Sequence, residues 1–286
     1  MMVIIGWVVA LACIFGAYVA IGGPIAALIQ PTKFIMIFGG AFGAFLAANN
    51  MHAFKHAMAG LAGCFKGSRY TKAFYMELLG LLYELLAKVR KEGLMSLEND
   101  VEEPDKSPIF TKYPNLLADH HLIEFITDYL RLMVGGNLNT IEIENLMDNE
   151  IETHHHEEMH SSHALAKMSD ALPAFGIVAA VMGVVITMGS LHLPPPALGA
   201  LIAKALVGAF LGILLSYGFM APLASVLETK ANESTKALQT VKVVLLASLN
   251  GFAPQVCVEF GRKVLYANER PSFRELEEDI KQRKGK

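Results

Sequence analysis

Long apolar segments alternate with polar ones along the chain. Four stretches consist almost entirely of apolar residues: 3–21, 34–48, 171–191 and 205–227. A run of about 20 mostly apolar residues is long enough for a helix to cross a hydrocarbon core of about 30 Å. A helix also satisfies its own backbone hydrogen bonds, as lipid requires. The pattern therefore predicts four transmembrane helices.

The last two apolar stretches form one hairpin between Asp170 and Glu228. They are joined at residues 192–196, which include three consecutive prolines, and Pro173 and Pro222 stand near their opposite ends. The only formal charge inside the hairpin is Lys204, near its bend. We expect the Lys204 ammonium to snorkel to the interface.

The charged residues give the predicted topology. All 27 acidic residues lie within 77–170 and 228–279. Lys and Arg also concentrate at the span ends that face these blocks, whereas the loop 22–33 offers only Lys33 and the proline-rich bend at 192–196 offers none. Positive residues favour the cytoplasmic side, so both termini are predicted to be cytoplasmic. The predicted divisions are residues 1–50 (transmembrane helices 1 and 2), 51–170 (cytoplasmic helical domain), 171–222 (transmembrane helices 3 and 4) and 223–286 (cytoplasmic C-terminal helices).

The polar segments carry helical patterns of their own. Apolar residues recur at helical spacing over 71–91, before Gly93, and over 116–133, before Gly135. Asn139 followed by Glu142 is typical of a capping box, and the helix that it begins is expected to run directly into the span at 171. A long amphipathic helix should follow Pro222, and 272–286 is predicted to be a solvated helix or a frayed tail. The predicted fold class is an all-α integral membrane protein with a helical cytoplasmic domain.

Composition supports this class and excludes others. The chain is 53% hydrophobic and 18% charged, too apolar for an ordinary soluble domain of 286 residues. No basic stripe suggests nucleic acid, so none is expected as a partner. Cys13, Cys64 and Cys257 are scattered, which argues against a disulfide framework or a zinc site. We predict a protein of the lipid bilayer that is not an enzyme and needs no cofactor.

No Asp or Glu lies within any predicted span. A proton or ion pathway through a bilayer usually carries an ionisable residue, because such a residue is costly there and is tolerated mainly for function. If the chain conducts protons, a partner must therefore supply the carboxylate.

Small residues share one face in each of the last two spans. One interpretation is tight helix packing, and the other is that these faces line a lumen around a partner helix. The predicted lumen residues are Ala180, Gly183, Thr187, Gly208, Ala209, Gly212, Ser216 and Tyr217. Pro173 and Pro222 are hinge candidates, because proline inside a helix removes a hydrogen bond and bends the axis; the alternative is that they merely begin or end helices.

Histidines cluster in residues 154–163. His156 and His160 are four residues apart, and His163 follows at three, which is a face that a divalent ion could use. A solvated, His-rich helix explains the same residues, and we predict no metal site.

Two motifs resemble the MotA family of flagellar motor stator proteins: ALPAFGIVAAVMGVV at 171–185 and ALVGAFLGILLSYGFMAPLA at 205–224. The resemblance covers essentially the whole chain. It implies a homo-oligomer, five copies around a dimer of MotB, whose single transmembrane helix supplies the proton-accepting aspartate. It also implies residence in the bacterial inner membrane.

The resemblance assigns roles to individual residues. Pro173 and Pro222 match the proline pair that couples ion passage to conformational change. Arg90 and Glu98 match the charged pair that contacts the rotor protein FliG. Ala180 stands where sodium-driven relatives carry threonine, which implies protons as the coupling ion. Ala209 departs from the family, which usually has threonine there.

The function implied is a proton-conducting stator subunit that turns ion flow into torque on the rotor. The nearest alternative is an ExbB or TolQ type energiser of envelope transport, which resembles a three-span plan and does not fit four spans. An autonomous channel or secondary transporter would need its own intramembrane polar site or an inverted repeat, and the sequence displays neither.

Overall fold

The computed structural model describes residues 2–136 and 139–284, and every regular element in them is a helix. The chain forms two compact units. We call Met1–Gly67 with Glu157–Lys230 the membrane unit, and Ser68–His156 with Ala231–Lys286 the second unit. The chain passes between them within α9 (Thr140–Met188) and α11 (Ala221–Leu249).

Four helical runs in the described residues are long and apolar enough to cross a membrane, which agrees with the four predicted spans. They are Met2–Ala20, Ile25–Ala48, Thr140–Met188 and Pro195–Leu249. The elements that contribute to the membrane unit are α1 (Met2–Ala20), α2 (Ile25–Leu28), α3 (Pro31–Ala48), α4 (Met51–Cys64), α10 (Pro195–Leu215), the π-helical segment η4 (Ser216–Met220) and parts of α9 and α11. As predicted, α9 runs without a break from Thr140 into the third span.

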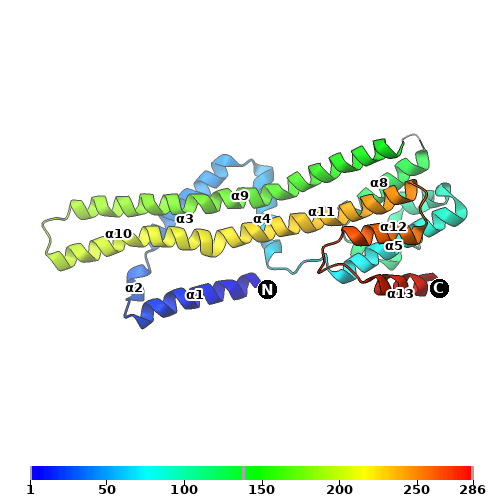
Figure 1. The fold of residues 1–286 in the computed structure, drawn as a ribbon. Coiled ribbons are helices and arrows are strands. Elements are labelled where there is room, and N and C mark those ends of the chain that lie inside the picture. Colours follow the sequence, from blue (N-terminus) through cyan, green and yellow to red (C-terminus); the bar gives the residue numbers. More distant parts are fainter. Residues whose placement is uncertain (1, 137–138, 285–286) are drawn as a thin grey trace. The chain divides into compact units, whose positions relative to one another are not determined.

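Helices α9 and α10 lie side by side in opposite directions, joined by the proline-rich hairpin (Figure 1). Helix α3 packs beside them through Ile37 and Ala41, in one cluster with Leu172 and Ala179 of α9. The helix α4 was not predicted; it begins where the Asn50 side chain accepts a hydrogen bond from Ala53 N at 2.8 Å.

At the C-terminal end of α4, the Lys230 ammonium group donates a hydrogen bond to Gly63 O at 2.6 Å. Ser162 of α9 donates to Ala224 O of α11 at 2.8 Å. These contacts place α4 and the first turns of α11 in the membrane unit. Its boundaries therefore differ from the predicted bilayer boundaries, which follow the apolar residues alone.

The second unit is built around α5. Its helices are α5 (Lys72–Glu92), η1 (Leu94–Leu97), α6 (Glu98–Glu102), η2 (Pro104–Lys106), η3 (Phe110–Lys112), α7 (Pro114–Leu117), α8 (His120–Gly135), α12 (Pro254–Val264), α13 (Phe273–Lys284) and parts of α9 and α11. Thr71 caps the start of α5, and Gly93, at φ 86°, ends this helix where the sequence predicted its end.

The second predicted helix starts later than expected. Leu116 belongs to the short helix α7, and Asp119 caps α8 by accepting from Leu122 N at 3.4 Å. The capping side chain interrupts what the apolar pattern alone presents as one helix.

The capping box that begins α9 is confirmed. Asn139 N donates to Glu142 Oε2 at 2.8 Å, and Glu142 N donates to Asn139 Oδ1 at 2.9 Å. Each side chain therefore satisfies a backbone N–H that the first helical turn leaves without a partner.

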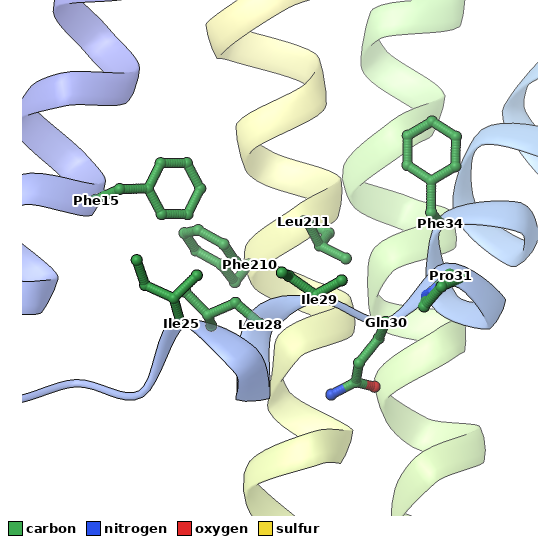
Figure 2. A pocket seen from close by; sticks show the side chains of 9 residues that line it. All are labelled: Phe15, Ile25, Leu28, Ile29, Gln30, Pro31, Phe34, Phe210 and Leu211. Atoms are coloured by element: carbon green, nitrogen blue, oxygen red, sulfur yellow. The ribbon is translucent and has the colours of Figure 1, made fainter.

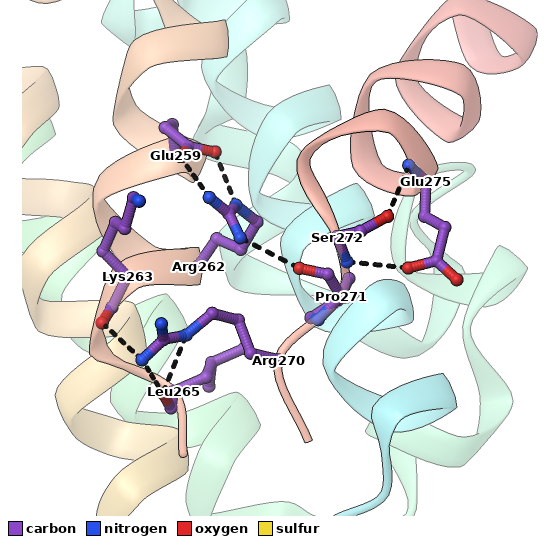
Figure 3. A network of polar contacts seen from close by, with 8 residues as sticks. All are labelled: Glu259, Arg262, Lys263, Leu265, Arg270, Pro271, Ser272 and Glu275. Atoms are coloured by element: carbon purple, nitrogen blue, oxygen red, sulfur yellow. Dashed lines mark hydrogen bonds and ion pairs between the residues drawn. The ribbon is translucent and has the colours of Figure 1, made fainter. Parts of the chain in front are cut away.

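The C-terminal helix α13 is more than a solvated tail, because Leu276 and Ile280 are buried. A polar network precedes it (Figure 3). The Arg262 guanidinium donates two hydrogen bonds to the Glu259 carboxylate, at 2.6 and 2.7 Å, and a third to Pro271 O at 3.0 Å. The bond from Arg262 holds the pKa of the Glu259 carboxyl below its usual value. The predicted C-terminal segment extends to residues 285 and 286, which lie outside the described residues.

Candidate functional site

The contact between α9 and α10 is made by backbone atoms. A Cβ added at Gly212 would lie 2.7 Å from Leu172 O and 2.9 Å from Gly176 Cα. A Cβ at Gly176 would lie 2.9 Å from Gly208 O. Real Cβ atoms do not approach backbone this closely, so only glycine permits this packing. Small residues at a helix interface are the usual device where lipid removes the hydrophobic drive.

The same contact continues toward the hairpin. A Cβ at Gly208 would lie 3.0 Å from Ala180 N, and one at Gly183 would lie 2.8 Å from Ala205 Cα. Gly183, Gly208 and Gly212 thus take part in packing within one chain, which supports the packing interpretation for these three positions. Ala180 and Ala209 are half-buried beside the contact.

The polar residues predicted to line a lumen differ in exposure. Thr187 is buried and donates to Gly183 O of its own helix at 2.9 Å. Ser216 is 1% exposed, whereas Tyr217 is 67% exposed. Among these three side chains, Tyr217 is the one that the single chain leaves free to meet another molecule.

Both candidate hinge prolines lie within helical runs. Pro173 is inside α9. Pro222 is the second residue of α11, which continues from η4 without a break in the run Pro195–Leu249. The interpretation that they merely begin or end helices therefore does not hold. Ahead of Pro222, Ala221 N donates to Ser216 O, the i to i−5 bond of a π-helix. The π segment accommodates a proline that cannot donate to the preceding turn.

A buried pair of hydroxyls links the two hinge regions. Ser169 Oγ lies 3.0 Å from Ser216 Oγ and also donates to Ser216 O at 3.3 Å. Ser169 is the residue whose carbonyl loses its usual helical partner because Pro173 has no N–H. Sequence reasoning missed Ser169, since 47 residues separate it from Ser216.

A cavity of about 290 Å³ opens in the membrane unit between α1, α2, α3 and α10 (Figure 2). It is lined by Phe15, Ile25, Leu28, Ile29, Gln30, Pro31, Phe34, Phe210 and Leu211. Its one polar side chain, Gln30, already donates to Ala27 O at 3.0 Å. The wall of this cavity therefore offers an ion no charged side chain.

The predicted charged pair lies on the surface of the second unit. Arg90 is in the last turn of α5 and Glu98 begins α6, with Gly93 and η1 between them. Both side chains are exposed, and neither forms an ion pair within the described residues. Their neighbour Lys88, by contrast, is bonded to the buried Asp100 at 2.6 Å. Arg90 and Glu98 are thus available to an external partner.

The first histidines of the His-rich segment face hydroxyl groups of α11. His154 Nε2 lies 2.8 Å from Ser234 Oγ, and His155 Nδ1 lies 3.0 Å from Thr235 Oγ1. In the part of the chain that the structure describes, no group of three or more His, Cys, Asp or Glu side chains is arranged to hold a metal ion. The contacts assign these two histidines to helix packing.

The apolar runs and the glycine contact define a multi-pass membrane protein whose apolar stretches 3–21, 34–48, 171–191 and 205–227 carry no acidic side chain. Residues 4–93 match the family model for the motility protein A N-terminal region, and residues 118–240 match that of the MotA/TolQ/ExbB proton channel family. Motility protein A of Salmonella typhimurium is 53% identical over 98% of this chain and 95% of that protein. Motility protein A of Escherichia coli gives the same identity and coverage.

Two solved structures share the fold. A C. jejuni MotAB structure has a TM-score of 0.79 at 21% identity and covers 95% of this chain and 98% of its own. The flagellar MotAB stator complex from Bacillus subtilis has a TM-score of 0.76 at 23% identity and covers 94% and 98%. The chain belongs to the MotA/TolQ/ExbB proton channel family, in its motility protein A group. The predicted family, fold class and non-enzymatic class are confirmed.

Proposed function

We propose that this chain is the channel-forming subunit of a flagellar motor stator, which conducts protons together with MotB and converts their flow into torque on the rotor. The observation that carries the proposal is the 53% identity with two motility proteins over 98% of the chain. The match of residues 4–93 to the motility protein A N-terminal model favours this function over an ExbB or TolQ type energiser.

MotB is the partner that best fits the chemistry of the spans. The apolar stretches 3–21, 34–48, 171–191 and 205–227 contain no carboxylate, so a proton path needs an acid from another chain. The fold neighbours from C. jejuni and Bacillus subtilis are MotAB structures, which supports a partner of this type. In our proposal a MotB dimer brings that aspartate into a ring of five copies of this chain, in the inner membrane, with both termini cytoplasmic.

The energy of each proton is small. One charge that crosses the membrane potential yields about 2.3 kcal/mol per 100 mV. Protonation removes the charge of the partner's aspartate from a low-dielectric lumen and so changes which helix packing is preferred. The face of α9 and α10 near Ala180, Ala209 and Tyr217 would meet the partner helix. Because α9 and α10 are packed backbone against backbone at glycines, their arrangement should change in discrete steps and not by gradual deformation.

Pro173 and Pro222 are the proposed hinges. Alanine at 173 would restore the N–H that bonds to the carbonyl of Ser169, and would stiffen α9 at this point. We expect Pro173→Ala to retain assembly with MotB but to abolish rotation, measured as co-purification and swimming. Normal swimming by this variant would contradict the hinge role.

Arg90 and Glu98 are the proposed contact with FliG, through oppositely charged rotor residues. Their exposure and lack of intramolecular ion pairs support this role. Arg90→Glu should weaken motility, and an opposite charge reversal on the rotor should restore part of it. Reversal at Lys72, which already pairs with Glu275, serves as the matched control, because no rotor reversal should rescue it. Failure of every rotor reversal to rescue Arg90→Glu or Glu98→Lys would argue against the electrostatic contact.

Purification from membranes tests the proposed function as a whole. The chain is tagged, extracted in mild detergent, and its co-purifying chains are identified. We expect a one-span partner with an acidic residue inside its span, in a complex with about five copies of this chain. A purified chain that conducts protons without such a partner would instead support the autonomous channel.

A further inference from the structure

Lys33 lies inside the membrane unit rather than at its surface. It is the third residue of α3 and only 9% exposed. Its ammonium group donates a hydrogen bond to the carbonyl oxygen of Ala179, in α9. The sequence presented Lys33 as a charge at the end of a loop. The structure places it against the helix that carries the proposed hinge.

The space for this ammonium group is provided by a glycine. A Cβ at Gly183 would lie 3.0 Å from Lys33 Nζ and 2.8 Å from Ala205 Cα. Helices α3, α9 and α10 therefore meet around the Lys33 head group. Ala180, the next residue after the one that accepts the Lys33 bond, is half-buried and belongs to the face that we assign to the partner helix. The positive charge is thus bonded to the backbone of α9 one residue away from that face.

No acidic group in the described part of the chain pairs with this charge. Among the described residues, Lys33 forms no ion pair, and the part of α9 from 171 to 188 carries no charged side chain. In α10 the charged residue is Lys204, which is exposed, and neither α1 nor α2 contains a formal charge. A buried lysine without an acidic partner is costly in a membrane, and such residues usually mark ion pathways.

We infer that Lys33 is a fixed positive charge that lowers the proton affinity of the acidic side chain which a partner inserts beside α9. The inference rests on the proposed function, since the carboxylate belongs to the partner. The Lys33 ammonium favours the ionised carboxylate and so promotes proton release after each protonation. Lys33 does not touch the carboxylate in this proposal. It donates to the backbone of α9 and acts on the carboxylate by long-range electrostatic attraction.

The expected size follows from Coulomb attraction. At an effective dielectric constant of about 20 and a separation of about 10 Å, one charge changes the proton affinity of another by about one pH unit. Removal of the Lys33 charge strengthens proton binding, so the carboxylate stays protonated to higher pH. The external pH at half-maximal proton flux should therefore rise.

The test measures proton flux through the complete complex, in vesicles of neutral lipid, as a function of external pH. We expect Lys33→Met to raise the midpoint by about one unit. Lys33→Arg, which keeps the charge, and Lys204→Met, which removes an exposed charge from α10, should leave the midpoint unchanged. Lys33→Gln keeps a donor for Ala179 O and should shift the midpoint as Lys33→Met does, even if the methionine variant assembles poorly.

A conducting complex in which Lys33→Met or Lys33→Gln has the wild-type midpoint would overturn the inference and leave the proposed function intact. An equal shift in Lys204→Met would also overturn it, because the effect would then be a general change of surface charge. A wild-type complex that carries no proton flux would overturn the proposed function instead.

Discussion

In the membrane unit, α9 and α10 meet backbone to backbone at Gly176 and Gly212, whereas in the second unit α5 is surrounded by large apolar side chains such as Leu82. Both units are helical, yet their helices are held together differently. In water, burial of apolar surface drives association at about 25 cal/mol per Å². In lipid that drive is absent, and close van der Waals approach replaces it.

The polar groups differ in the same way. The second unit carries ion pairs, such as Lys88 with the buried Asp100 at 2.6 Å. In the membrane unit the buried hydroxyls of Thr187 and Ser169 bond to helix backbone or to another hydroxyl. The one buried ammonium, among the described residues of the spans, is that of Lys33. A buried charge therefore has an ion-pair partner in the second unit, whereas the buried Lys33 of the membrane unit has none among the described residues.

The largest stability effect is expected from the core of the second unit. Leu82 is fully buried, so Leu82→Ala should lower the free energy of unfolding by about 2–5 kcal/mol. The matched control is Leu206→Ala in α10, where the side chain is 61% exposed and would face lipid. Thermal denaturation of the purified complex measures both. Equal losses in the two variants would contradict the distinction between the units.

A smaller effect is expected at the glycine contact. Gly212→Ala places a methyl group against the carbonyl of Leu172, and overpacking of this kind costs about 1–3 kcal/mol. Gly199→Ala in the same helix meets nothing within 4 Å and should be neutral or slightly stabilising. The amount of folded protein recovered from membranes compares the two. A Gly212 variant as abundant as the Gly199 variant would mean that α9 and α10 can separate freely.

The smallest effect is expected at the surface of the second unit. The hydrogen bond from Lys72, followed by those from Ser272, lowers the pKa of the Glu275 carboxyl to about 2. This interaction stabilises α13 fully above the ordinary carboxyl pKa, about 4.3, and the stabilisation is lost as pH falls toward 2. Glu275→Gln should thus slightly reduce hydrogen-exchange protection of α13 at pH 6, and less at pH 3. An equal reduction at both values would exclude the carboxylate as the cause.

Much of the fold follows from local patterns. Thr71 and Gly93 bound α5, and the pair Asn139 and Glu142 begins α9, because capping depends on residues close in sequence. Helix α4 was missed because its mixed pattern resembles neither a span nor an amphipathic helix. The π segment before Pro222 was also missed. Its hydrogen-bond pattern depends on the proline that follows it and on the contact of Ser216 with Ser169 of α9.

The site was less predictable than the fold. The glycine stripes are visible in the sequence, but their contact partners are not, so packing and lumen lining could not be separated for Gly208 or Gly212. Ser169 and Lys33 form their hydrogen bonds with residues that are 47 and 146 positions away in the sequence. Such distant contacts have no local signal. The absence of Asp and Glu from the predicted spans, by contrast, can be read directly from the sequence.

We propose above that this chain forms half of a proton path and that a partner supplies the acid. Proton flux into vesicles tests it most directly, with the chain alone, with the complete complex, and with the complex in which the partner's intramembrane Asp is replaced by Asn. We expect flux only in the complete, unaltered complex. Flux through the chain alone, or undiminished flux with the Asn variant, would contradict it.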